Sequence, residues 1–176
     1  MFNHILAAVD GSSHAQRAVE TAAWLAKKVD AKLLSLCHVV GSGPVPAELT
    51  HMAEVEHLVP GPRPAGVQIV ENVMGNLATI ERVGEAGEIS YETRLAISRK
   101  ILHDASGTAV RLGAPSVEAV LLEGQAVPEI LDLANKIHAD LIVMGSRGLS
   151  DLKGLLMGSV SHRICQLAGC PCLTVR

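Results

Sequence analysis

Aromatic side chains are scarce in this chain of 176 residues, which holds one Trp, one Tyr and one Phe. This scarcity argues against the aromatic stacking platforms that usually hold single-stranded nucleic acids. The net charge is −3 at pH 7, and no run of basic residues stands out. The electrostatic footprint of a nucleic-acid-binding protein is therefore missing as well, and we expect no nucleic acid partner.

Signals for export and membrane insertion are also missing from the sequence. The segment 1–4 lacks the basic region of a secretory signal peptide, and Asp10 ends the first apolar run early. No run approaches the roughly 20 apolar residues of a membrane span. Without a secretory signal, the cysteines are expected to be reduced thiols, and the protein is expected to be cytoplasmic without membrane insertion. The four cysteines are Cys37, Cys165, Cys170 and Cys172.

Short apolar segments alternate along the chain with segments of helical periodicity. This alternation predicts an α/β fold in which a parallel sheet is covered by helices on both faces. Pro171 at the first position of the last apolar segment suits an edge strand. The length fits one domain, 1–176, and the apolar fraction of 48% is enough for a proper core. The expected strands are 5–9, 32–40, 117–122, 140–144 and 171–175, and the expected helices are 15–29, 91–112, 129–137 and 160–167.

The extended middle segment, residues 41–88, shows the weakest patterns. Glycine and proline predict loops at 41–46 and 60–64. A stripe of apolar residues farther on fits a helix, although Gly75 weakens that interpretation. The residues of this stripe are Val70, Val73, Met74, Leu77 and Ile80.

The most informative motif begins where the strand at 140–144 ends. Met144-Gly145-Ser146-Arg147-Gly148 is followed, after nine residues, by Gly158-Ser159-Val160-Ser161 at the start of an expected helix. Glycines let backbone amides approach an anion closely, and a helix start adds unpaired N–H groups with partial positive charge. The serines add hydroxyl donors. The motif therefore predicts a phosphate cradle and, with it, a nucleotide ligand.

Other interpretations of these residues stay open at this stage. The glycines also suit tight turns, and Asp10 also suits the N-cap of the following helix, a role that Ser12 or Ser13 can fill instead. Arg147 is either a phosphate partner or a solvated loop residue. The motif is not a Walker loop, because no Gly-Lys-Ser/Thr follows the first strand.

The cysteines and His38 point to structure more than to chemistry. Cys165, Cys170 and Cys172 lie near His162, but their spacing is not that of a zinc site. Cys170 and Cys172 are expected to face the same side as small apolar core residues. His38, in a strand, is interpreted as structural.

Taken together, the quoted motifs resemble the universal stress protein family. The resemblance is carried by residues 5–12 (ILAAVDGS), by 37–40 (CHVV), by the Gly145-x2-Gly148-x9-Gly158-Ser159 pattern, and by 170–175 (CPCLTV). It covers roughly residues 1–40 and 90–176. No recognised motif falls in the middle segment.

The resemblance implies a Rossmann-like, adenine nucleotide alpha hydrolase-like sheet of five parallel strands in the order 3-2-1-4-5. It also implies a homodimer through the last strand, and ATP with Mg or Mn held on the phosphates. By residue, it places Asp10 at the ribose or adenine, Ala8, Val9 and Val39 around the base, Met144 and Gly145 at the ribose, and Gly148, Gly158, Ser159 and Val160 at the phosphates. Gly124, Ser146, Arg147 and Ser161 complete the expected site.

Three functions follow as hypotheses. In the first, the chain is an ATP-binding stress-response regulator, a dimeric switch acting on a protein partner. In the second, it is a slow ATP hydrolase or phosphotransferase, for which Asp10 with a metal and Arg147 are the only candidate groups. In the third, it is an interaction protein whose site is empty or holds AMP or cyclic AMP. The glycine pattern and the lack of a dedicated base favour the first.

Overall fold

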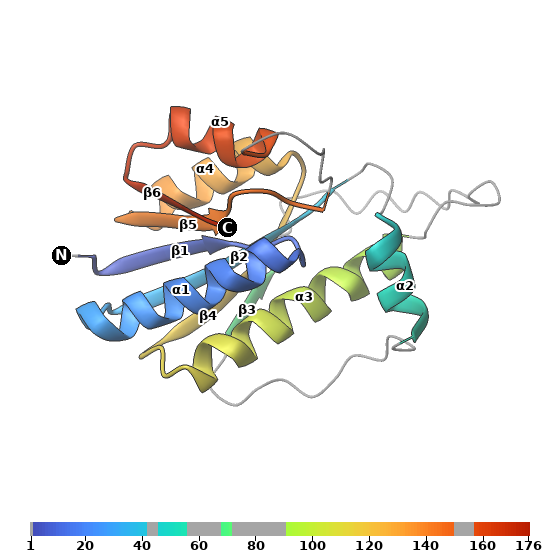
Figure 1. The fold of residues 1–176 in the computed structure, drawn as a ribbon, viewed down its shortest axis with the longest axis horizontal. Helices are drawn as coiled ribbons and strands as arrows, with labels where there is room; N and C mark the ends of the chain where they lie inside the picture. The colour runs from blue at the N-terminus through green and yellow to red at the C-terminus, as the bar shows by residue number, and fades with distance from the viewer. Residues whose placement is uncertain (1, 42–45, 56–67, 72–90, 150–156) are drawn as a thin grey trace.

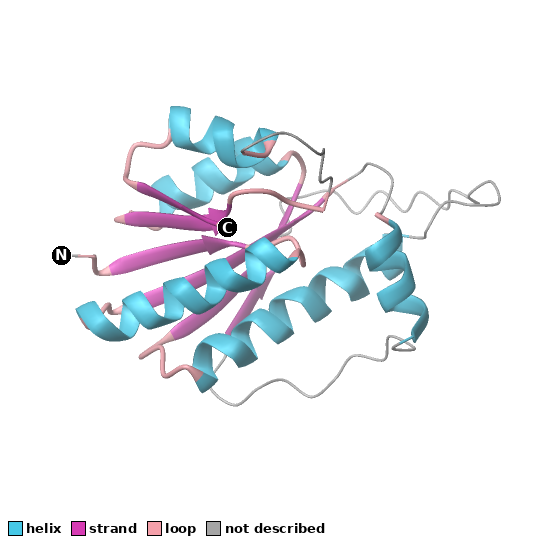
Figure 2. Ribbon diagram, viewed as in Figure 1, coloured by secondary structure: helices cyan, strands magenta, loops and turns pink. Residues whose placement is uncertain are grey.

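The computed structural model describes residues 2–41, 46–55, 68–71, 91–149 and 157–176. Within these residues, six parallel strands form one sheet in the order β3-β4-β2-β1-β5-β6 (Figure 1). The strands are β1 (His4–Ala8), β2 (Leu33–Val40), β3 (Gln68–Glu71), β4 (Val117–Glu123), β5 (Leu141–Gly145) and β6 (Cys172–Val175). The helices are α1 (Ser13–Val29), α2 (Ala47–Val55), α3 (Tyr91–Arg111), α4 (Ala126–Lys136) and α5 (Ser159–Leu167) (Figure 2).

The predicted order of five strands is confirmed as β4-β2-β1-β5-β6, with β6 at one edge. The structure adds β3 beside β4 at the other edge. Val70 lies in β3, so the predicted helical stripe is wrong at this residue. A short apolar run is compatible with the periodicity of a helix and with that of a strand. Here the available edge of β4 favours the extended form. The rest of that stripe and the predicted loop at 60–64 lie outside the described residues. Helix α2 was not predicted.

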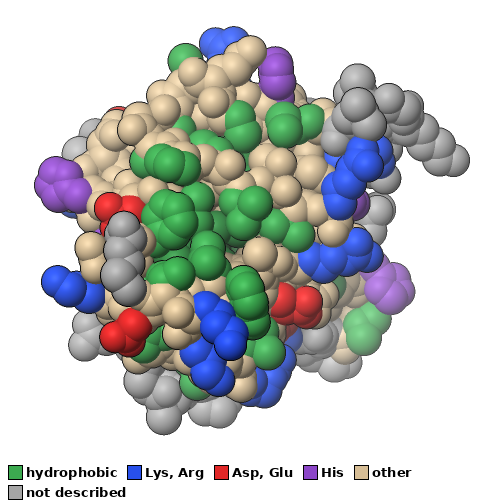
Figure 3. All heavy atoms as spheres, turned by 60° about the vertical axis from the view of Figure 1, so that its left-hand side comes forward, with side chains coloured by type: hydrophobic (Ala, Val, Ile, Leu, Met, Phe, Trp, Pro, Cys, Tyr) green, Lys and Arg blue, Asp and Glu red, His purple; other side chains and the backbone are tan. Residues whose placement is uncertain are grey.

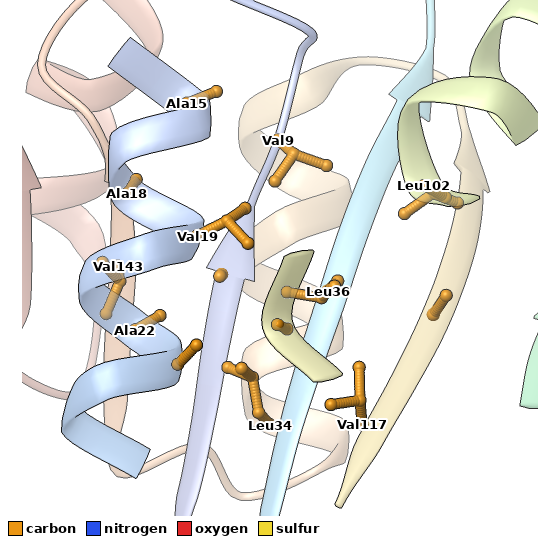
Figure 4. Packing of buried hydrophobic residues seen from close by; sticks show 14 of the residues in the cluster. Val9, Ala15, Ala18, Val19, Ala22, Leu34, Leu36, Leu102, Val117 and Val143 are labelled. Carbon is orange, nitrogen blue, oxygen red and sulfur yellow. The ribbon is translucent and has the colours of Figure 1, made fainter. Parts of the chain in front are cut away.

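Helices α1 and α3 cover one face of the sheet. Alternate residues of the strands point toward this face, among them Leu34, Leu36 and Val143. Helix α1 meets them mainly with alanines such as Ala18 and Ala22, which are fully buried. Figure 4 shows these small side chains directed at the strands, so the helix backbone lies close to the sheet. Close packing of this kind makes the interface sensitive to added volume.

Helices α4 and α5 cover the opposite face (Figure 1). The intervening strand residues, including Leu6 and Ile142, point to this side and pack with Ile130 of α4 and Ile164 of α5. The alternation follows from the two-residue period of a strand. Both faces of the central strands are buried, which explains why the sequence shows them as continuous apolar runs.

The start of α1 is set by Ser12, whose Oγ accepts a hydrogen bond from Ala15 N at 3.2 Å. Ser12 therefore fills the N-cap role that the sequence left open between it, Ser13 and Asp10. The Oδ1 atom of Asp10 instead accepts a hydrogen bond from Ser12 N at 3.0 Å. This bond holds the Asp10 carboxylate at the end of β1. Gly113, with φ +83°, follows the end of α3, which agrees with the predicted helix 91–112.

None of the helices in the described part of the chain is long and apolar enough to cross a membrane.

Candidate functional site

A pocket of about 340 Å³ opens at the carboxyl ends of β1, β2 and β5. Strands β1 and β5 are direct neighbours, with Ala8 paired to Met144. Strand β2 lies on one side of β1 and strand β5 lies on the other, so the strand order reverses at β1. Parallel α/β sheets bind ligands at such a switch point in the strand order. The prediction that the loops after these two strands meet at one crevice is confirmed.

Most of the residues predicted from the sequence line this pocket. Gly124 and Ser146 do not. Gly124 lies beyond the end of β4, where its amide donates to the carbonyl oxygen of Val40. The predicted residues that line the pocket are Ala8, Val9, Asp10, Val39, Met144, Gly145, Arg147, Gly148, Gly158, Ser159, Val160 and Ser161.

Two glycines of the motif are required by close contacts. A Cβ on Gly148 would collide with Oδ2 of Asp10. A Cβ on Gly145 would lie 2.9 Å from the backbone nitrogen of Ala15 and the same distance from the carbonyl oxygen of Arg147. Gly145 thus lets β5 approach the start of α1, while Gly148 brings the loop backbone against the Asp10 carboxylate. Gly145 therefore has no room for a side chain, whereas a Cβ at Gly148 would require the Asp10 carboxylate to move.

The two halves of the glycine motif are tied together by the carbonyl oxygen of Ser146. This oxygen accepts one hydrogen bond from Gly158 N at 2.7 Å and another from Ser161 Oγ at 2.9 Å. Ser161 is buried, and its hydroxyl also donates to the carbonyl oxygen of Gly158. Ser146 and Ser161 therefore shape the loop. The side chain of Ser146 is buried away from the pocket.

The N-terminus of α5 is open toward the pocket. Its N-cap residue is Gly158, which makes no side-chain cap, whereas α1 is capped by Ser12. The first N–H groups of a helix have no partner within the helix and carry a partial positive charge. Ser159 and Val160, both exposed, lie in this first turn and line the pocket. The end of α5 is thus suited to an anionic group of a ligand.

His38 also lines the pocket, a position the sequence interpretation missed. Its Nδ1 lies 2.8 Å from the carbonyl oxygen of Val9 and donates a hydrogen bond to it. Burial lowers the pKa of His38, although that hydrogen bond and the charge of Asp10 oppose the shift. Neighbouring Cys37 lines the pocket as well, and complete burial raises the pKa of its thiol to about 12. The position of His38 near the end of β2 was the available signal, because strand ends meet at the switch point.

Charged groups are few around the pocket. Among the described lining residues, Asp10 supplies the carboxylate and half-buried Arg147 the guanidinium. Nowhere among the described residues do three His, Cys, Asp or Glu side chains group so as to hold a metal ion. The pocket therefore combines an apolar interior with one carboxylate, one cation and a helix start.

The fold and this site define a class of proteins that bind ligands at the switch point of a parallel sheet. The family model described as the universal stress protein family matches residues 1–176. A universal stress protein of Bacillus subtilis, YxiE, is 34% identical, with 100% of each chain covered. A universal stress protein of Thermus aquaticus is 32% identical, again over 100% of each chain. The chain belongs to the universal stress protein family.

Solved structures show the same fold. UspA from Lactobacillus plantarum superposes with a TM-score of 0.68 at 19% identity, covering 99% of this chain and 98% of that one. A universal stress protein in complex with cAMP gives 0.63 at 20% identity, covering 99% and 97%. The Archaeoglobus fulgidus protein in complex with dAMP gives 0.60 at 18% identity, covering 100% and 98%.

Proposed function

We propose that this chain binds ATP in the pocket between the end of β1 and the glycine motif, and that the bound nucleotide makes it a regulatory switch. The observation that carries the proposal is the pairing of two close-fitting glycines with the uncapped start of α5 at one end of an apolar pocket. Related structures hold adenine nucleotides, cAMP in one and dAMP in another. These support an adenine nucleotide here.

The apolar part of the pocket suits the adenine base. Val9, Val39 and Met144 lie at the ends of three neighbouring strands and line this part with aliphatic side chains. Such surfaces favour a flat heterocycle, because binding removes apolar surface of both the base and the pocket from water. The Oδ1 atom of Asp10 accepts the hydrogen bond from Ser12 N, and its Oδ2 atom faces the glycine loop. That oxygen is placed to accept a hydrogen bond from a ribose hydroxyl.

The phosphates belong at the other end of the pocket. Gly148 lines that end, and the first turn of α5 adds its N–H groups and the hydroxyl of Ser159. Arg147 adds a positive charge from within the same loop. These groups fit an anion held by backbone donors and a helix start. A divalent cation, Mg or Mn, would be held mainly by phosphate oxygens, with Asp10 as the protein carboxylate within the pocket.

A binding role is better supported than catalysis. Phosphoryl transfer to water needs a group that orients the attacking molecule and groups that stabilise the developing charge. The Nδ1 of His38 is committed to the Val9 carbonyl oxygen, and one oxygen of Asp10 is committed to Ser12. We therefore propose that turnover is slow and that occupancy is the signal. A hydrolase remains the second candidate, supported by Asp10 and Arg147 lining the same pocket.

The switch acts on a protein partner through a dimer, in this proposal. Among the described strands, β6 lies at the sheet edge, and the outer backbone groups of an edge strand can pair with a second copy. Leu173 of β6 is exposed, as is Trp24 of α1. Figure 3 shows hydrophobic side chains gathered over the middle of one face of the molecule, a distribution typical of a protein interface.

The first experiment identifies the nucleotide that co-purifies with the protein, by denaturing it and analysing the supernatant by chromatography with mass detection. Release of ATP at about one per chain is the expected result. Titrations of stripped protein with ATP, AMP and cyclic AMP, each with and without magnesium, then rank the ligands. If no nucleotide is released and none raises the melting temperature, the proposal fails.

A matched pair of variants tests the site itself. In Gly148→Ala the new methyl group forces Oδ2 of Asp10 to move, so ATP affinity is expected to fall about tenfold, which corresponds to about 1.4 kcal/mol. Gly169→Ala is the control, since a Cβ at Gly169 meets nothing within 4 Å. Equal affinities for the two variants would contradict the assignment of Asp10 and the glycine loop to the ligand.

A further inference from the structure

A groove of about 500 Å³ runs between the C-terminal halves of α1 and α3. The two helices lie side by side on the same face of the sheet (Figure 1). Helix α1 contributes Trp24, Lys27 and Lys28 to the groove, and Arg111 and Leu112 line its other side at the end of α3. The groove shares no lining residue with the nucleotide pocket, so it is a separate feature of the surface.

Trp24 is the most exposed large aromatic side chain of this surface. It is the single tryptophan of the chain, and 57% of it is exposed. Helix α1 packs on the sheet through other residues, and Trp24 belongs to neither buried cluster. Leu112, on the opposite side of the groove, is 42% exposed. Tryptophan contributes strongly to protein interfaces when a partner removes it from water, so this groove has an apolar centre suited to a partner.

The charge of the groove is opposite to that of the whole chain. Its lining carries three cations, Lys27, Lys28 and Arg111, and one carboxylate, Glu20, whereas the net charge of the chain is −3. Within the described part of the chain, no carboxylate forms a salt bridge with any of these three cations. Arg111 instead donates a hydrogen bond to the neutral Thr108 Oγ1 at 3.0 Å. The positive charge of the groove is therefore available to a partner.

The cations gather at one end of the groove, beside the indole of Trp24. Trp24 and Lys28 are four residues apart on α1, so they lie next to each other along one stripe of the helix. The Lys27 side chain reaches toward the end of α3, because a Cβ on Gly113 would lie 3.0 Å from Lys27 Nζ. Glu20 lies about one helical turn from Trp24 in the other direction. A partner therefore meets an apolar contact and a cationic cluster side by side.

Basic residues in the last turn of a helix also offset the partial negative charge of its C-terminus. Lys27, Lys28 and Arg111 all lie in such last turns. The helix dipole accounts for the cations but not for an exposed indole beside them. Helix α4, on the opposite face of the sheet, has exposed Lys136 in its last turn. Lys136 is thus a matched control for a lysine that serves the helix dipole alone.

We propose that the groove between α1 and α3 docks an acidic segment of a partner protein. An apolar side chain of the segment covers Trp24 and Leu112, and its carboxylates pair with Lys27, Lys28 and Arg111. Complementary charge speeds the encounter and selects acidic partners, because a neutral segment leaves the cations unpaired and a basic one is repelled. The groove lies outside the nucleotide pocket, so this docking does not depend on the binding of ATP.

The test follows the fluorescence of Trp24, which reports on the groove alone because the chain has no other tryptophan. The protein, stripped of nucleotide and again with ATP and magnesium, is titrated with a short synthetic peptide in which leucines alternate with aspartates and glutamates. The expected result is a saturable blue shift of the emission that weakens as sodium chloride is added. Two control peptides, one with asparagine and glutamine for the acids and one with serine for leucine, are expected to bind about tenfold more weakly.

Two matched pairs of variants assign the residues, with the anisotropy of a dye-labelled peptide as the measurement. Trp24→Ala and Lys28→Glu are each expected to weaken binding about tenfold or more. Their controls are Leu167→Ala, at an exposed apolar position on α5, and Lys136→Glu on α4, and both are expected to keep the affinity of the unchanged protein. Far-UV circular dichroism and the melting temperature check that each variant is folded.

Several outcomes would overturn the proposal. Equal binding of the three peptides, no response to any of them, or equal losses in Lys28→Glu and Lys136→Glu would each do so. A shift of Trp24 emission on dilution of the protein, without a response to the peptide, would assign the groove to a second copy of the chain. A response to phosphatidylglycerol vesicles but not to the peptide would assign it to a membrane surface. Failure of ATP to bind would leave the proposal standing, because the stripped protein is titrated separately.

Discussion

Gly145→Ala is the substitution whose effect on stability the structure defines most closely. The added Cβ would lie 2.9 Å from three backbone atoms, namely Ala15 N, the carbonyl carbon of His14 and the carbonyl oxygen of Arg147. Backbone atoms cannot rotate away, so α1 and β5 must separate by several tenths of an ångström. Overpacking of this kind costs about 1–3 kcal/mol. Ala15 N also donates to Ser12 Oγ, and weakening that cap adds up to about 1 kcal/mol.

The assay is equilibrium unfolding in urea, with a thermal melt alongside. The expected loss of about 1–4 kcal/mol lowers the melting temperature by roughly 2–16 °C, at about 2–4 °C per kcal/mol for a chain of this size. Gly169→Ala is the control, because its Cβ enters open space. Equal urea midpoints for the two variants would refute the inference that Gly145 permits the close approach of α1 and β5.

Three further predictions concern other parts of the molecule. Ser12→Ala removes the cap on Ala15 N and is expected to lower the free energy of unfolding by about 1 kcal/mol, measured by urea denaturation. Burial lowers the pKa of His38 below 6.5, so the unfolded chain binds more protons and the free energy of unfolding falls as the pH drops through about 6.5. His38→Asn is expected to reduce the fall in the free energy of unfolding between about pH 7.5 and 5.5. It does not abolish the fall, because burial lowers the pKa of His4 too. An unchanged slope would contradict the inference that buried His38 contributes to this pH dependence. Leu173→Lys places a charge on the exposed edge strand and is expected to turn the proposed dimer into a monomer in light scattering, and a wild-type monomer at micromolar concentration would remove the dimer altogether.

Local patterns were enough for the regular parts of the fold. The strand at 140–144 and the helix at 15–29 were predicted within two residues of β5 and α1. Their signals lie in consecutive residues, as a continuous apolar run in one case and a helical repeat of alanines in the other. The edge position of β6 followed from Pro171 in the same way. The prediction of a helix at Val70 was wrong, because the few apolar residues there are compatible with either a helix or a strand. The extended form was decided by pairing with the edge of β4.

The glycine motif could be found in the sequence because its residues are close together and chemically distinctive. The three-dimensional contacts of these residues could not be predicted from the sequence. The contact of Gly148 with Asp10 joins residues far apart in the chain, and it arises because β1 and β5 are neighbours. His38 was missed for the same reason, since its place in the pocket depends on where β2 lies relative to β1.

The sequence by itself determined the class of fold, the glycine motif and the likeness to universal stress proteins, since each depends on residue types at short, fixed spacings. The tertiary structure alone decided which glycines have no room for a side chain and that Ser12 caps α1. These features depend on distances between atoms of different elements, which arise only when the hydrophobic faces of the helices pack onto the sheet.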